Sequence, residues 1–210
     1  MEIKYMEFLN QKVIEDLAAG IPISLDLGSG GIRIEGFYGV DHLPLPGVDI
    51  VANLNLALDK IPDNSVTRIR SNHALEHVQE FLPLMREIHR ICRSDARIEI
   101  VVPHFSNVYG FSDPTHVRFF GLYSMYYFVS PEQQPRQRRV PAFYSDTRFT
   151  IDKIWFEFYR IGWFDTIFAS LVSRVVNRSL ACQDFYERRL SSLFHARQLV
   201  FRMRPVKDKI

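Results

Sequence analysis

The stretch that most constrains the fold is a short apolar segment that runs directly into glycines. Residues 23–27 read Ile-Ser-Leu-Asp-Leu and are followed by Gly28, Ser29 and Gly30. An apolar run of this length is typical of a buried strand. Two glycines in the turn let the backbone approach a ligand with no Cβ in the way. Because ligands bind at the carboxyl ends of strands in open α/β sheets, we expect a binding site at this turn.

Two carboxylates stand where such a ligand could be held. Asp26 precedes the turn and can accept hydrogen bonds from a cationic ammonium or from turn amides. Asp41 follows Gly28 by 13 residues, at the end of the next expected strand. There its carboxylate can bind both hydroxyls of a ribose.

Short apolar segments alternate with helical patterns along the first half of the chain. Helices are expected over residues 5–19 and about 80–93. The expected strands are residues 23–27, 37–40, 49–52, 67–70 and 98–102. This alternation predicts parallel pairing in a covered sheet, as in a doubly wound, Rossmann-like α/β fold.

The final third has a different pattern. Residues 149–158 and 197–204 alternate apolar with polar side chains, which predicts an antiparallel carboxy-terminal edge on the mostly parallel sheet. Between them an amphipathic helix is expected over about 163–178. Its apolar stripe comprises Phe164, Ile167, Phe168, Leu171, Val172 and Val175. Packing against the edge strands or a second subunit is the default interpretation of this stripe, and an anionic membrane surface is the alternative.

Composition limits the number of domains, the cellular location and the kinds of partner to be expected. With 210 residues, 47% hydrophobic and 24% charged, the chain is expected to be one soluble domain over 1–210. Its two cysteines, Cys92 and Cys182, form no disulfide framework and no CxxC zinc motif, so a reducing, cytoplasmic location is expected. Residues 1–135 carry 11 Lys/Arg and 17 Asp/Glu, whereas residues 136–210 carry 15 and 7. The basic last third favours an anionic acceptor or membrane surface, and a solvated basic face is the alternative.

Six segments in order resemble the class I S-adenosylmethionine-dependent methyltransferases, in particular their small type 11-like branch. They read LDLGSG, GFYGVD, VDIVANL, DNSV, SNHALEH and IVVP, at residues 25–30, 36–41, 48–54, 63–66, 71–77 and 100–103. The resemblance covers about 21–123 and implies the seven-stranded methyltransferase fold with S-adenosylmethionine as cofactor.

The resemblance also implies roles for particular residues. The cofactor is expected to lie against Asp26, Gly28, Ser29, Gly30, Asp41, Asn53, Leu54, Ser71 and Asn72. The glycine turn is expected at the methionine end and Asp41 at the ribose. Asn53 and Leu54 are expected at the adenine, and Ser71 and Asn72 at the methionine carboxylate and sulfonium. The sequence departs from the family pattern at Ile32, where a third glycine is usual, and at Asn53, where an acid is more common. The link after Gly30 is also too short for a full crossover helix.

The loop after the fifth expected strand carries the candidate chemistry. Methyl transfer depends mainly on in-line positioning, but a hydroxyl acceptor must also lose its proton. His116 is the first candidate base and His104 the second, with Asp113 placed to orient either one. The alternative is a polar loop in which Asp113 caps a turn.

Acceptor-side residues are expected in a lid region over about 104–180. Arg118 could hold an anionic acceptor, and Tyr123 belongs to an aromatic run that could roof the pocket. Packing is the alternative for the aromatic run.

His73-Ala-Leu-Glu76-His77 also matches the H-x-x-E-H motif of zinc peptidases. In that hypothesis His73 and His77 share one helix face, and Glu76 acts as base. We favour a different interpretation, in which Glu76 and His77 hydrogen-bond the loop that flanks the cofactor. No bound metal is expected.

The expected function is therefore S-adenosylmethionine-dependent methyl transfer to a small-molecule or glycan acceptor, at oxygen. The alternatives are a non-catalytic S-adenosylmethionine-binding protein on the same fold and, at lower rank, the zinc hydrolase. Nucleic acid ranks low as a partner, because neither an Asn-Pro-Pro-aromatic signature nor an RNA-binding appendage is present. Whether the protein forms a homodimer is left open by the sequence.

Overall fold

The computed structural model describes residues 6–207, without the side chains of Phe164 and Asp165. Its centre is one eight-stranded sheet in the order β1-β4-β3-β2-β5-β6-β8-β7. The strands are β1 Glu7–Phe8, β2 Ile23–Leu27, β3 Tyr38–Asp41, β4 Ile50–Val51, β5 Val66–Asn72, β6 Cys92–Pro103, β7 Arg148–Phe158 and β8 Ala196–Val206. The helices are α1 Gln11–Ala18, α2 Phe81–Ile91, α3 Gly162–Val176 and α4 Leu180–Arg189.

The pairing confirms the expected fold class. Strands β4, β3, β2, β5 and β6 pair in parallel, and β6, β8 and β7 form the antiparallel carboxy-terminal edge. The described sheet has one strand more than expected, because two-residue β1 pairs antiparallel with β4.

The amino-terminal helix is shorter than expected. The prediction began at Tyr5, which lies outside the described residues, and residues 7–8 form β1 instead. Helix α1 starts at Gln11 because the Asn10 side chain accepts from the backbone N–H of Lys12 as its N-cap. The same side chain donates to Asp49 at 2.6 Å, which ties the start of the helix to the sheet.

A second difference is α4, which the sequence analysis did not predict. Its residues Leu-Ala-Cys-Gln-Asp-Phe-Tyr-Glu-Arg-Arg are polar on most sides and show little apolar periodicity. Ser179 caps the helix by accepting from the N–H of Cys182. The helix therefore depends on its cap and on the buried side chains of Gln183 and Tyr186.

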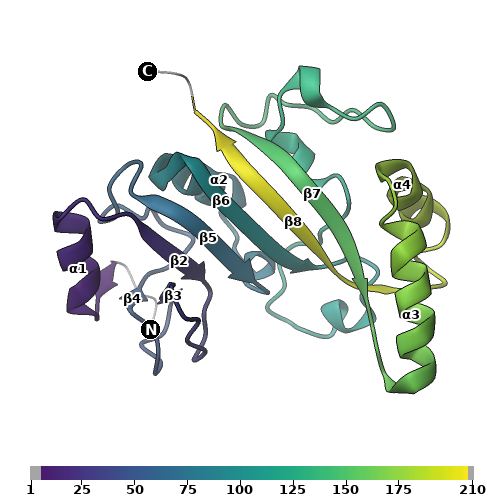
Figure 1. Ribbon diagram of the computed structural model, residues 1–210, viewed down its shortest axis with the longest axis horizontal. Coiled ribbons are helices and arrows are strands. Elements are labelled where there is room, and N and C mark those ends of the chain that lie inside the picture. Colours follow the sequence, from purple (N-terminus) through teal and green to yellow (C-terminus); the bar gives the residue numbers. More distant parts are fainter. Residues whose placement is uncertain (1–5, 208–210) are drawn as a thin grey trace.

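Helix α2 covers one face of the sheet with Leu84 and Ile88, which join Leu25, Ile69 and Ile98 in the core. In Figure 1 α2 lies behind the sheet, and no helix of the described chain crosses the near face of β2, β5, β6 and β8. The cover expected from the alternation of strands and helices is therefore found on one face of these four strands. The link between β2 and β3 is too short for a crossover helix, so nothing from it covers this face.

Charged side chains occupy the face opposite α2. Asp26, Arg70, Glu99 and Arg202 stand in register across β2, β5, β6 and β8, and we call them the charge row. Arg70 Nη1 lies 2.8 Å from Asp26 Oδ1, and Arg202 Nε lies 2.7 Å from Glu99 Oε2. Alternating signs across neighbouring strands let the uncovered face meet water.

No helix of the described residues has the length and apolar character to cross a bilayer.

The charge row predicts two unequal losses of stability. Arg70→Met should lower the free energy of unfolding by about 3 kcal/mol, because it leaves the buried Asp26 carboxylate without its cation. The matched variant Arg202→Met should cost at most about 1 kcal/mol, since both members of its pair with Glu99 are partly exposed to solvent. Urea unfolding of both variants is the measurement. Equal losses would show that the burial of Asp26 has no bearing on the pair.

Candidate functional site

The turn after β2 forms a loop that its neighbours hold in place. Gly28 and Gly30 have φ values of 73° and 56°, in the left-handed region that favours glycine. A Cβ on Gly28 would lie 2.2 Å from the Cβ of Ala74, whereas one on Gly30 would meet nothing within 4 Å. Packing against Ala74 therefore requires glycine at 28, and the loop is open at Gly30.

Asp41 ends β3 directly beside this loop, as expected. Its Oδ2 accepts from the N–H of Gly30 at 2.8 Å, and its Oδ1 accepts from the N–H of Leu43 at 3.1 Å. A carboxylate oxygen can accept more than one hydrogen bond. Asp41 can therefore fix the glycine loop and still accept from two hydroxyls.

Asp26 accepts hydrogen bonds from a side chain of the sheet and not from the amides of the turn. Both of its oxygens accept from Arg70 Nη1, at 2.8 and 3.0 Å. Burial raises the pKa of its carboxyl, and the Arg70 guanidinium opposes that shift. Asp26 thus serves the charge row rather than the turn amides.

The segment 71–77, at the end of β5 and directly after it, carries two of the other expected cofactor residues. Ser71 pairs in register with Leu27, next to the glycine loop, and is fully buried, whereas Asn72 is exposed. Asn53 lies after β4, where its Oδ1 accepts from the N–H of Asn55 at 2.9 Å. The neighbouring Leu54 is half-buried against the core.

Two buried side-chain oxygens of the described residues lack a hydrogen-bond partner, and both lie in this segment. They are Ser71 Oγ and Glu76 Oε2. A buried polar atom without a partner costs about 1–3 kcal/mol, so two such atoms close together in the sequence indicate a place for a polar ligand. They lie on the same short segment as Ala74, which the glycine loop touches.

His116 is held beside this segment with one ring nitrogen open. Its Nδ1 lies 2.8 Å from the carbonyl oxygen of Gly110. A carbonyl can only accept, so Nδ1 carries the proton and Nε2 keeps its lone pair in the neutral ring. Nε2 lies 3.7 Å from Asp113 Oδ2 and 4.0 Å from Glu76 Oε1.

The loop that carries His116 is fixed to the segment after β5 by two contacts. The N–H of Val117 donates to the carbonyl of Glu76 at 2.9 Å. Thr115 Oγ1 donates to Asp113 Oδ1 at 2.5 Å and lies 2.8 Å from His77 Nδ1. These hydrogen bonds from Thr115 lower the pKa of Asp113, which keeps it a carboxylate. The N–H of Thr115 also donates to Asp113 Oδ1 at 2.9 Å, so Asp113 caps a turn, as the alternative interpretation of this loop expected. Thr115 itself was not among the expected site residues.

His104, the second candidate base, lies in the core. Its side chain is fully buried, with Nδ1 2.7 Å from Ser106 Oγ and Nε2 3.2 Å from Glu187 Oε2. Its ring packs against Phe105 and Phe156. With both nitrogens engaged and no exposure to solvent, His104 is placed for packing and not for proton transfer. No local sequence signal indicates Glu187, which is 83 residues away.

The two residues expected to contact the acceptor both make hydrogen bonds within the protein. Arg118 donates to the carbonyls of Val78 and Gln79 at 2.9 and 2.8 Å. Tyr123 is buried and donates to Asp184 Oδ1 at 2.8 Å. Burial and Asp184 raise the pKa of the Tyr123 hydroxyl. Arg118 also lines a cavity of about 320 Å³ with Phe119 and Tyr127. The role of Arg118 and Tyr123 toward an acceptor stays a prediction.

The zinc hypothesis needs a helix that the structure does not form. Residues Leu75–His77 make a single 3-10 turn, so His73 and His77 do not share an α-helical face. His73 Nδ1 lies 3.2 Å from Glu76 Oε1, and its Nε2 lies 2.7 Å from Gln198 Oε1. The hydrogen bond to Glu76 is the main cause that raises the pKa of His73.

A looser group comprises Glu76, His77 and His116, whose ligand atoms lie within 4.8 Å of one another. Zinc binds its ligands at about 2.0–2.1 Å, which brings tetrahedral ligand atoms within about 3.5 Å of each other. The group is too open for such a shell without rearrangement.

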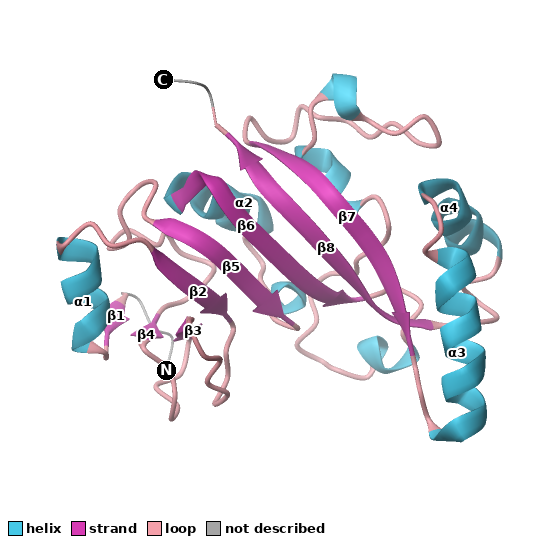
Figure 2. Cartoon of the chain, in the orientation of Figure 1, coloured by secondary structure: helices cyan, strands magenta, loops and turns pink. Residues whose placement is uncertain are grey.

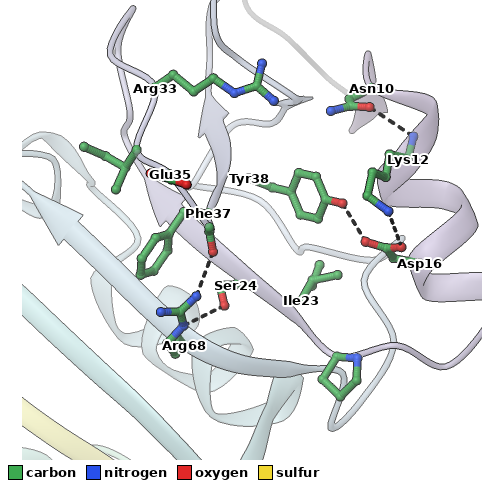
Figure 3. A pocket seen from close by; sticks show the side chains of 13 residues that line it. Asn10, Lys12, Asp16, Ile23, Ser24, Arg33, Glu35, Phe37, Tyr38 and Arg68 are labelled. Atoms are coloured by element: carbon green, nitrogen blue, oxygen red, sulfur yellow. Dashed lines mark hydrogen bonds and ion pairs between the residues drawn. The ribbon is translucent and has the colours of Figure 1, made fainter.

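A polar cleft of about 620 Å³ lies elsewhere, between α1 and the amino ends of β2 and β3 (Figure 3). Its polar side chains bind one another. Tyr38 donates to Asp16 at 2.6 Å, and Arg68 donates to Ser24 Oγ at 3.0 Å. The cleft is at the opposite end of the strands from the glycine loop, so the candidate site stays at the carboxyl ends.

No family model matches the sequence, and no curated protein matches it. Solved structures do match. An S-adenosylmethionine-dependent methyltransferase from Archaeoglobus fulgidus aligns over 92% of this chain and 93% of its own, with TM-score 0.53 and 18% identity. The YcgJ protein of Bacillus subtilis aligns over 94% and 98%, with TM-score 0.51 and 12% identity. The chain has the class I methyltransferase fold. The resemblance found in the sequence motifs is thus confirmed at the level of the fold.

We expect that protein purified without a metal-affinity tag contains well under one zinc ion per chain. The reason is that His73 is turned to Gln198 and the remaining group is too wide. Elemental analysis is the measurement. Stoichiometric zinc that disappears on His73→Ala would contradict the expectation.

Proposed function

We propose that the chain transfers a methyl group from S-adenosylmethionine to a hydroxyl of a small-molecule or glycan acceptor. The observation that carries this proposal is the Nε2 of His116, whose Nδ1 is held by the Gly110 carbonyl and which lies 4.0 Å from Glu76 Oε1. Glu76 belongs to the segment 71–77, which has two buried oxygens without partners and touches the glycine loop through Ala74. These features meet at the carboxyl ends of the parallel strands, where α/β sheets bind their ligands.

The residues at this edge fit the cofactor. Asp41 would accept from the ribose hydroxyls while it holds the N–H of Gly30. Ser71, whose Oγ lacks a partner, would face the methionine end, and Asn53 and Leu54 would border the adenine. When bound, S-adenosylmethionine supplies a methyl group activated by its sulfonium charge.

His116 supplies the acid–base chemistry. Its Nε2 takes the proton of the acceptor hydroxyl, because Nδ1 already donates to the Gly110 carbonyl and fixes the tautomer. The imidazolium that results is stabilised by the Asp113 carboxylate, 3.7 Å from Nε2. A positioned base of this kind favours oxygen as the methylated atom.

Asp41→Ala should weaken S-adenosylmethionine binding at least about tenfold, because both ribose hydroxyls lose a charge-assisted partner. Calorimetric titration measures the affinity, and circular dichroism confirms that the variant is folded. The exposed carboxylate of Asp59 provides a matched control, so Asp59→Ala should bind as the parent does. Unchanged affinity of a folded Asp41→Ala protein would reject this position for the ribose.

His116→Ala should lower methyl transfer by roughly 10²-fold or more and leave cofactor affinity nearly intact. The assay follows tritium from labelled S-adenosylmethionine into an extract of polar metabolites and glycans. His195→Ala, which removes an exposed imidazole elsewhere, is the control and should keep the parent rate.

Full transfer by His116→Ala would overturn the assignment of the base. Tight cofactor binding by a parent protein that transfers no label to any fraction would instead favour a binding protein without catalysis.

A further inference from the structure

Helix α3 is apolar on the side that faces away from the sheet as well as on the side that packs against it. On the inner side, Ala169 and Val176 are buried and Val172 packs on the core. On the outer side, a row at four-residue spacing stands exposed: Trp163 at 77%, Ile167 at 63%, Leu171 at 58% and Val175 at 58%. We call these four residues the α3 row. A contiguous exposed apolar row of this kind marks an interaction surface.

The apolar surface continues beyond the helix. The rings of Phe168 and Phe194 lie 5.2 Å apart, which joins α3 to the turn after α4. In that turn Leu193 is strongly exposed. Figures 1 and 2 show α3 and α4 at the edge of the sheet, beyond β7. The surface therefore borders solvent along the whole length of α3.

Among residues 160–197, the exposed Lys, Arg, Asp and Glu side chains that the structure describes are all arginines. Residues 160–197 contain six arginines, of which Arg160, Arg174 and Arg178 are exposed near α3. Of the carboxylates in this stretch whose side chains the structure describes, Asp184 is held by Arg188 and Tyr123. Glu187 accepts from the N–H of Leu122 and contacts His104. Both are thus turned inward.

We propose that the α3 row docks on the surface of an anionic lipid bilayer. A bilayer offers an apolar layer for the row and phosphate groups for the flanking arginines. The helix has 15 residues, about 22 Å at 1.5 Å per residue, so it lies in the interface rather than across it. This docking goes beyond the proposed methyl transfer and stands on separate residues.

A second copy of the chain fits this surface less well. A twofold contact through α3 would cover the apolar row of both copies, but it would give Arg174 and Arg178 no anionic partner from the described carboxylates of residues 160–197. Asp184 and Glu187 both bond internally. The bilayer satisfies the apolar row and the arginines together.

Cosedimentation with vesicles tests the proposal. The parent protein should pellet with vesicles of equal parts phosphatidylcholine and phosphatidylglycerol and remain largely in solution with phosphatidylcholine alone. Ile167→Ser/Leu171→Ser should bind the anionic vesicles at least about tenfold more weakly. The matched control is Ile32→Ser, which removes an equally exposed apolar side chain from the link after β2.

The arginines are tested separately. Arg174→Gln/Arg178→Gln should reduce the preference for anionic vesicles several-fold, whereas Arg93→Gln, also exposed, should not. The emission of Trp163, isolated in a Trp155→Phe background, should shift to the blue on anionic vesicles as the indole leaves water. Thermal unfolding confirms that each variant is folded.

Absence of vesicle binding by the parent protein would overturn the proposal. So would undiminished binding by folded Ile167→Ser/Leu171→Ser, because the row would then lie outside the contact. A dimer in sedimentation equilibrium that the same double variant dissociates would show that a second copy covers the row.

Discussion

The arrangement of the site depends on one close contact between two backbone segments. Gly28 approaches Ala74 so closely that any side chain at 28 would overlap it. The contact holds the glycine loop against the segment that carries Ser71 and Glu76. That segment in turn receives the His116 loop through the hydrogen bond from Val117. The cofactor side and the acceptor side of the site are therefore coupled through packing of the backbone, and a shift at Gly28 would reach both.

The short link between β2 and β3 explains why the face of the sheet opposite α2 has no helix over it. Because the chain from Gly30 to β3 has no room for a crossover helix, the face of β2, β5 and β6 opposite α2 is left bare. Central parallel strands normally read as continuous apolar runs because helices cover both faces. Here β5 carries Arg68 and Arg70 at alternate positions, and β6 carries Arg97 and Glu99. The charged residues of β5 and β6 therefore suit a sheet face that no helix covers.

The sequence predicted the elements whose signals are local. Residues 23–27 are β2 without any shift, because an apolar run that ends in glycine marks both boundaries. The position of Asp41 at the carboxyl end of β3 followed from the expected strand, whereas its hydrogen bond to the N–H of Gly30 was not predicted. The hydrogen-bond partners of His104, Arg118 and Tyr123 could not be predicted, because they are far along the chain or are backbone carbonyls. Glu187 and Asp184 belong to α4, and the sequence of this helix lacks the apolar periodicity that would have predicted it.

The side chains of the charge row differ in their exposure to water from one end of the row to the other. At the β2 end, the Asp26 side chain is only 3% exposed, whereas at the β8 end Arg202 is 56% exposed. Dissolved ions screen exposed pairs strongly and buried pairs weakly. Rising ionic strength would therefore weaken the junction of β6 with β8 while the junction of β2 with β5 keeps its ion pair. The strand that leads into the glycine loop is thus insulated from the salt content of its surroundings, and the antiparallel edge is exposed to it.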